Sequence, residues 1–237
     1  MDTMTNQLKI SSANNFTCKW CGKSFKSERT LSVHMCVKKR RIADKDLTHT
    51  RLGYRVFQML YEMNTTASKP KSYEDFVRSQ YYEGFVKFGR SCVTNEYLKP
   101  EEFAEWLIKE GKKLADWSKD KLYDEFLLVY VKKEPGMKAL ERTIIYLDSW
   151  GKEHNKPWQD YFKEVSSARA VHDIRSAKIS PWMIYLCESG DELLVKFSDE
   201  QVKMIQHIID ATFWMKQFAN NREEVEEVKN ACEVAGI

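Results

Sequence analysis

Residues 16–36 read FTCKWCGKSFKSERTLSVHMC, and this stretch decides how the N-terminal part of the chain folds. Two residues separate Cys18 from Cys21, and a turn with this spacing presents two thiolates to one tetrahedral metal ion. The residues that follow suit a short helix, which brings His34 toward the same ion. The pattern therefore predicts a metal site.

The same stretch resembles a C2H2-type zinc finger from Phe16 to His34. The resemblance rests on the Cys-x-x-Cys spacing, the Cys-Gly-Lys-Ser-Phe knuckle and the apolar residues Phe16, Phe25 and Leu31. It implies a ββα unit over residues 16–37 with Zn²⁺ as its cofactor. A core of three side chains is too small to fold without the ion.

The chain departs from the finger pattern at the fourth ligand, because residues 38–40 are Lys-Lys-Arg where the family has a second His. Cys36 is the nearest soft ligand. Residues i and i+2 do not share a helix face, so the helix must end or tighten near His34 for Cys36 to reach the ion. The predicted metal ligands are Cys18, Cys21, His34 and Cys36. A three-ligand site completed by water or by His49 stays open as the alternative.

Positive charge is concentrated near the N-terminus. Residues 1–55 hold 12 Lys and Arg against 4 Asp and Glu, a net of +8, whereas residues 56–237 carry a net of −5. A basic run next to the finger suits phosphate, and a single finger covers only about 3 bp. We therefore expect nonspecific nucleic-acid binding. The predicted contact residues are Arg29, which resembles a base-reading position, and Lys38, Lys39, Arg40 and Arg41. A solubilising segment or a protein contact is the alternative.

The composition predicts an all-α fold, a multi-helix globular domain with a small N-terminal ββα zinc finger. The chain has 9 Gly and 5 Pro in 237 residues, which is few turn-forming residues. The predicted boundaries are a flexible N-terminus at 1–15, a finger at 16–37, a basic linker at 38–51 and a helical domain at 52–237. Residues 42–50 equally suit the start of the next helix.

Helix ends and buried positions are also predicted from local patterns. Ser72 and Ser198 each begin a helix, the first continuing to about Gly89. Apolar spacing predicts a core that includes Trp106, Phe126, Trp182, Ile205 and Trp214. Cys92, Cys187 and Cys232 are expected to be buried, apolar in character and without chemistry of their own.

Membrane and secreted proteins are excluded as classes, since no apolar run approaches a span and the first residues lack a leader. We expect an intracellular protein with reduced cysteines and no membrane partner. No catalytic motif is present, and no catalytic residue is predicted. An enzyme in the helical domain stays an alternative, which convergence of Arg78, Arg90, Arg175 or Asp173 in one cleft would favour.

The whole chain resembles proteins of large tailed phages related to T4 that join a short finger to a helical body. The resemblance rests on residues 34–41, 85–89 and 178–182. It implies the host cytoplasm as the location and no particular chemistry. The sequence thus predicts a zinc-binding, nucleic-acid-associated accessory protein of low sequence specificity. A protein–protein adaptor and an enzyme are the alternative functions.

Overall fold

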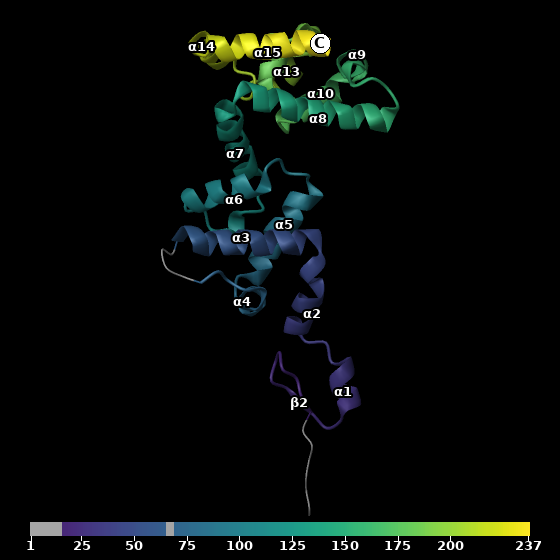
Figure 1. The fold of residues 1–237 in the computed structure, drawn as a ribbon, viewed down its shortest axis with the longest axis vertical. Coiled ribbons are helices and arrows are strands. Elements are labelled where there is room, and N and C mark those ends of the chain that lie inside the picture. The colour runs from purple at the N-terminus through teal and green to yellow at the C-terminus, as the bar shows by residue number, and fades with distance from the viewer. Residues whose placement is uncertain (1–15, 65–68) are drawn as a thin grey trace, which may run out of the picture. The chain divides into compact units, whose positions relative to one another are not determined.

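The computed structural model describes residues 16–64 and 69–237 of the chain (Figure 1). In this part of the chain there are fifteen α-helices and one two-stranded sheet, which confirms the predicted all-α class with a small ββα finger. The predicted flexible segment at 1–15 lies outside the described residues. The chain groups into two compact units, residues 1–94 and 95–237, which are described separately below.

The described part of the first unit contains the finger and four further α-helices. Its elements are β1 (Phe16–Thr17), β2 (Ser24–Phe25), α1 (Glu28–Val33), α2 (Val37–Ala43), a 3-10 turn (Asp44–Asp46), α3 (Thr48–Asn64), α4 (Tyr73–Arg78) and α5 (Tyr82–Thr94).

In the second unit, residues 95–237, the regular secondary structure consists of helices. Its α-helices are α6 (Pro100–Lys109), α7 (Asp120–Lys133), α8 (Gly136–His154), α9 (Tyr161–Glu164), α10 (Ser167–Arg175), α11 (Pro181–Leu186), α12 (Glu188–Val195), α13 (Asp199–Ile205), α14 (Ala211–Asn220) and α15 (Arg222–Ala235). Short 3-10 turns lie at Leu114–Asp116 and Trp158–Asp160. Among the described helices, none combines the length and hydrophobicity that crossing a membrane requires.

The residues predicted as a basic linker, 38–51, are helical over most of their length. Helix α2 occupies the first part, and α3 begins at Thr48. Arg41 links α2 to α4 and α5. Its guanidinium donates to the Val77 carbonyl in α4 at 2.8 Å and forms an ion pair with Glu83 in α5 at 3.1 Å. This segment is therefore folded against its neighbours.

Helices α3 and α5 pack closely because glycines lie where they meet (Figure 1). A Cβ atom on Gly89 would lie 2.1 Å from the carbonyl oxygen of His49, and one on Gly53 would lie 2.7 Å from that of Phe85. Gly89 is inside α5 and does not end a helix. The helix predicted from Ser72 to Gly89 is instead divided into α4 and α5 by a break at Ser79.

The core of the second unit agrees with the predicted helical faces. Phe126, Trp182, Ile205 and Trp214 are buried, whereas Trp106 is only partly buried. Both predicted caps are present, since Ser72 and Ser198 each form a capping box.

The three scattered cysteines are buried, as expected, but two of them have chemistry that their spacing did not indicate. Cys187 at the start of α12 and Cys232 in α15 are joined in a disulfide across 45 residues of sequence. Cys92 is a free buried thiol in the first unit. The expectation that all three are plain apolar residues is therefore wrong for Cys187 and Cys232.

Candidate metal centre

A tight turn between β1 and β2 holds the first two donors. The strands pair antiparallel with Phe16 opposite Phe25. Within the turn, the Cys18 N–H donates to the Lys23 carbonyl at 2.9 Å and the Gly22 N–H donates to the Cys18 carbonyl at 2.8 Å. Gly22 has a φ of +72°, a left-handed conformation that glycine adopts without a steric penalty. The glycine of the knuckle thus lets the chain turn directly after Cys21.

Helix α1 ends where the fourth ligand requires it to end. His34 is its C-cap, with extended backbone (φ −67°, ψ 120°), and Cys36 is the N-cap of α2. The chain therefore leaves the helical path between the two residues. This break removes the obstacle that the i, i+2 spacing would impose within one helix.

The donor atoms of Cys18, Cys21, His34 and Cys36 all lie within 4.8 Å of one another. The Cys21 Sγ is 3.3 Å from the His34 Nε2. Four ligands arranged as a tetrahedron around zinc, with bonds of about 2.0–2.3 Å, are separated by about 3.3–3.8 Å. The Cys21–His34 distance has this value, and donors within 4.8 Å of one another are close enough to hold one metal ion. These residues form one potential zinc site. His49 lies in α3 and is not part of the group.

The thiols influence each other's ionisation. The pKa of Cys18 is lowered to about 7, chiefly because the Cys21 N–H donates to its sulfur. The Lys23 N–H lowers the pKa of Cys21, but burial and the neighbouring sulfurs of Cys18 and Cys36 outweigh it, and the net shift is upward. Thiolates gathered this closely repel one another, and a bound divalent cation removes that repulsion. The donor set of three sulfurs and one imidazole is typical of zinc.

Neighbouring groups fix the orientation of two of the donors. The His34 ring packs against the Phe25 ring, with centroids 4.7 Å apart. The Cys36 sulfur accepts a hydrogen bond from the Lys39 N–H at 3.5 Å, and the Lys39 ammonium donates to the His34 carbonyl at 3.1 Å. Contacts of this kind orient metal ligands and commonly matter nearly as much as the ligands themselves.

No protein-family model, curated protein or solved structure matches this chain. The compatibility with a zinc finger therefore rests on the geometry of the four donors and the ββα arrangement around them. The resemblance to tailed-phage proteins stays a prediction.

The predicted nucleic-acid contacts differ in how free their side chains are. Arg29 is exposed on α1, and Arg40 is exposed on α2. Lys38 and Lys39 are partly buried, the latter with the hydrogen bond already described. Arg41 is held within the first unit, where its guanidinium also lies 4.3 Å from the centre of the Tyr82 ring. Arg41 therefore acts in packing and is a poor choice for a phosphate contact.

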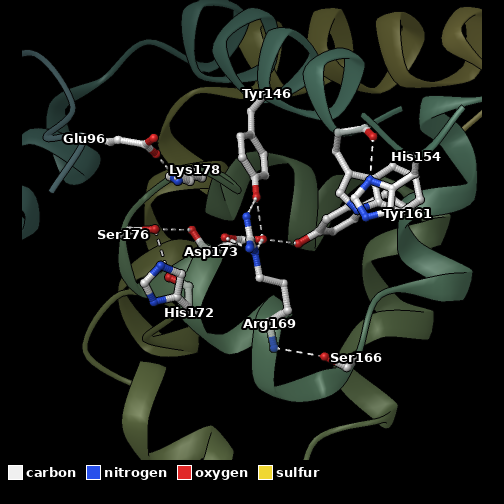
Figure 2. Close-up of polar contacts among 11 residues, drawn as sticks. Glu96, Tyr146, His154, Tyr161, Ser166, Arg169, His172, Asp173, Ser176 and Lys178 are labelled. Carbon is white, nitrogen blue, oxygen red and sulfur yellow. Dashed lines mark hydrogen bonds and ion pairs between the residues drawn. The ribbon is translucent and has the colours of Figure 1, made fainter. Parts of the chain in front are cut away.

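Sequence reasoning missed a buried polar network in the second unit, centred on Asp173 (Figure 2). Asp173 is fully buried, and its Oδ2 accepts hydrogen bonds from the hydroxyls of Tyr146 at 2.7 Å and Tyr161 at 2.8 Å. The Arg169 Nε donates to both carboxylate oxygens, at 3.0 and 2.9 Å. Only the i, i+4 spacing of Arg169 and Asp173 was visible in the sequence. The network joins α8, α9 and α10 and compensates the buried charge.

The residues named for the enzyme alternative do not share partners. Arg175 forms an ion pair with Asp124 at 3.5 Å, and Arg78 forms one with Glu74 at 3.5 Å. Asp173 is saturated by the tyrosines and by Arg169. The geometry of Asp173 is that of a structural carboxylate.

The Asp173 network makes stability sensitive to alkaline pH. Burial, and then Asp173, raises the pKa of Tyr146 to about 12, and the same causes raise the pKa of Tyr161. A group with a raised folded-state pKa stabilises fully below its unfolded value, about 10, and this stabilisation is lost as pH rises through the folded value. We expect the free energy of unfolding to fall between pH 10 and 12, and to fall less steeply in Tyr146→Phe.

Urea denaturation at several pH values in this range, followed by circular dichroism, measures that slope. The exposed Tyr81 provides the matched control, since Tyr81→Phe should keep the wild-type slope. Equal slopes for Tyr146→Phe and the wild type would show that Tyr146 does not contribute.

Proposed function

We propose that this chain is a zinc-binding accessory protein that associates with nucleic acid through its basic N-terminal segment, with little sequence preference. The observation that supports the proposal most is the group of four donors placed directly before α2. Residues 16–41 carry eight Lys and Arg against one acidic residue. Zinc would hold the hairpin and α1 together, and the basic side chains would neutralise phosphates.

Low specificity follows from the exposed surface of α1. Arg29 is the one residue there suited to a guanine edge. Ser27 is occupied as the N-cap, since its hydroxyl accepts from the Thr30 N–H at 3.3 Å. Val33 is apolar. A single arginine contact gives about 1–3 kcal/mol of discrimination, which is too little to select a site.

A binding titration on duplex DNA at several salt concentrations tests the proposal. With Lys38, Lys39 and Arg40 in contact with phosphates, log Kobs should fall against log salt with a slope of about −2 to −3. The triple variant Lys38→Ala/Lys39→Ala/Arg40→Ala should lose most of the binding and of this slope, because each contact releases about one counterion.

Arg41→Ala is the matched control, as it removes the adjacent positive charge. It should leave the salt slope unchanged while lowering the free energy of unfolding by about 1.5–3 kcal/mol, because charged hydrogen bonds inside the first unit are lost. If Arg41→Ala reduces the salt slope as much as the triple variant does, the assignment of the phosphate contacts is wrong. If the full zinc-loaded chain shows no salt-dependent binding, the nucleic-acid proposal fails.

A protein adaptor is the second candidate, and a specific observation favours it. Val33, Met35 and Val37 are 76 %, 57 % and 61 % exposed, and they alternate along the chain with the donors His34 and Cys36. Apolar side chains grouped on a small surface commonly mark a protein contact. Binding of a protein partner that Met35→Ser abolishes, together with no binding to DNA, would favour the adaptor.

A further inference from the structure

A cavity of about 810 Å³ lies within the second unit, lined by residues of α6, α7 and α8. One part of its lining is aromatic. The Trp106 and Phe126 ring centroids are 6.1 Å apart, and those of Phe126 and Tyr130 are 5.6 Å apart. The cavity accounts for the partial exposure of Trp106. Its volume lies in the range of about 300–1,000 Å³ that is usual for small-molecule sites.

A buried ion pair braces the lining of the cavity. The Glu134 Oε1 accepts from the Arg142 Nε at 2.8 Å and from the Tyr130 hydroxyl at 2.8 Å, and its Oε2 accepts from the Arg142 Nη2 at 2.6 Å. The two charged side chains are only 4 % and 13 % exposed. Arg142 also donates to the Ala177 carbonyl. The hydrogen-bonding atoms of these side chains are already used within the protein, so the side chains fix the shape of the cavity. Recognition of a ligand therefore depends on the other residues of the lining.

The remaining charges of the lining divide into paired and unpaired residues. Four of them form two exposed ion pairs, Lys99 with Glu102 at 3.7 Å and Lys109 with Glu105 at 2.5 Å. Among the described residues, Lys133, Lys138 and Glu141 have no ion-pair partner although they line the same cavity. The cavity therefore combines a ring-lined surface, two free cations and one free carboxylate.

We infer that this cavity binds a nucleotide. A base stacks on the aromatic lining, Lys133 and Lys138 contact its phosphate, and Glu141 accepts a hydrogen bond from an exocyclic amino group of the base. Aromatic rings with nearby lysines are the usual means of holding a base and its phosphate. A purely apolar ligand would leave the two lysines and the carboxylate unused. The inference goes beyond the proposed function, because it concerns residues of the second unit and needs neither zinc nor the basic segment.

The nucleotide can be a free mononucleotide or one unit of a single strand, and both share this chemistry. The first experiment is equilibrium dialysis of the full zinc-loaded chain with radiolabelled AMP, compared with adenosine and with inorganic phosphate. AMP should bind at least about tenfold more tightly than either, because two lysine contacts and the stacked base act together. Equal affinity for AMP and adenosine, or no binding at millimolar AMP, would overturn the inference.

Variants locate the site. Lys133→Ala/Lys138→Ala should weaken AMP at least about tenfold and leave adenosine unchanged, since two phosphate contacts are lost. Trp106→Leu should weaken both ligands, because the base loses its stacking partner. Lys203→Ala/Lys216→Ala removes two exposed lysines elsewhere in the second unit and should change nothing. If the two double variants weaken AMP equally, the cavity is not the site.

A competition experiment distinguishes a free mononucleotide from one unit of a single strand. It uses the triple variant Lys38→Ala/Lys39→Ala/Arg40→Ala, which lacks the proposed DNA contacts. If an eight-nucleotide oligo(dA) displaces labelled AMP, the cavity binds nucleotides and its ligand is a single strand. If labelled AMP stays bound in the presence of the oligonucleotide, the cavity binds nucleotides and its ligand is a free mononucleotide. Failure of the basic segment to bind duplex DNA would affect neither result, so the two proposals fail separately.

Discussion

Removal of zinc is expected to unfold the finger, residues 16–37, while the second unit stays folded. The finger has few apolar side chains to bury, and no finger residue other than Cys18 is buried. A domain with so small a core folds stably only when a metal ion joins its ligands. In a ¹H–¹⁵N NMR spectrum, removal of zinc with a chelator should narrow the chemical-shift dispersion of the finger amides. The amide resonances of residues 95–237 should keep their positions.

Replacement of Cys36 by serine should lower zinc affinity at least about 100-fold. Loss of a group that only orients a ligand commonly costs about 10–100-fold, and loss of the ligand itself costs at least as much. In the cobalt-substituted protein the sulfur-to-cobalt charge-transfer band should fall by about one third, because three thiolates become two.

Two controls distinguish the ligand sets. Cys92→Ser changes a buried cysteine outside the group, whose pKa is raised to about 12 by burial, and should leave the zinc content at one. His49→Ala should also keep the metal. Loss of zinc from His49→Ala together with its retention in Cys36→Ser would establish the three-ligand alternative with His49.

Gly89→Ala is expected to destabilise the first unit by about 3 kcal/mol or more. The new Cβ would lie 2.1 Å from the His49 carbonyl oxygen, and that oxygen belongs to the backbone of α3, which cannot rotate away. Overpacking of a tight contact commonly costs about 1–3 kcal/mol and sometimes more. Alanine is more favourable than glycine in a helix by only about 1 kcal/mol, so the steric clash is the larger effect and the net change is destabilising.

Urea denaturation of the zinc-loaded chain measures this change. Gly53→Ala, whose Cβ would lie 2.7 Å from the Phe85 carbonyl oxygen, should be destabilised less. Lys87→Ala, an exposed change in the same helix, should unfold like the wild type. If Gly89→Ala is as stable as Lys87→Ala, the close packing of α3 on α5 is wrong.

The sequence by itself determined the features that depend on a few neighbouring residues. The spacing of Cys18, Cys21 and His34 and the missing second His pointed to Cys36, which the structure places in the same group of donors. The caps at Ser72 and Ser198 were predicted for the same reason, since a cap is an interaction across three residues. Helical periodicity identified four of the five core residues because it records which face turns inward.

Only the tertiary structure decided the features that join distant segments. Gly89 looked like a helix end, but its missing side chain is what admits the His49 carbonyl. Arg41 looked like part of a free basic run, yet its guanidinium is bound by residues about 36 to 42 positions away. The Cys187–Cys232 disulfide joins residues 45 positions apart, and the two tyrosines that bind Asp173 lie 27 and 12 positions from it. Local spacing fixes which way a side chain points from its own helix, but the partner it meets depends on how the helices pack, which no short stretch of sequence specifies.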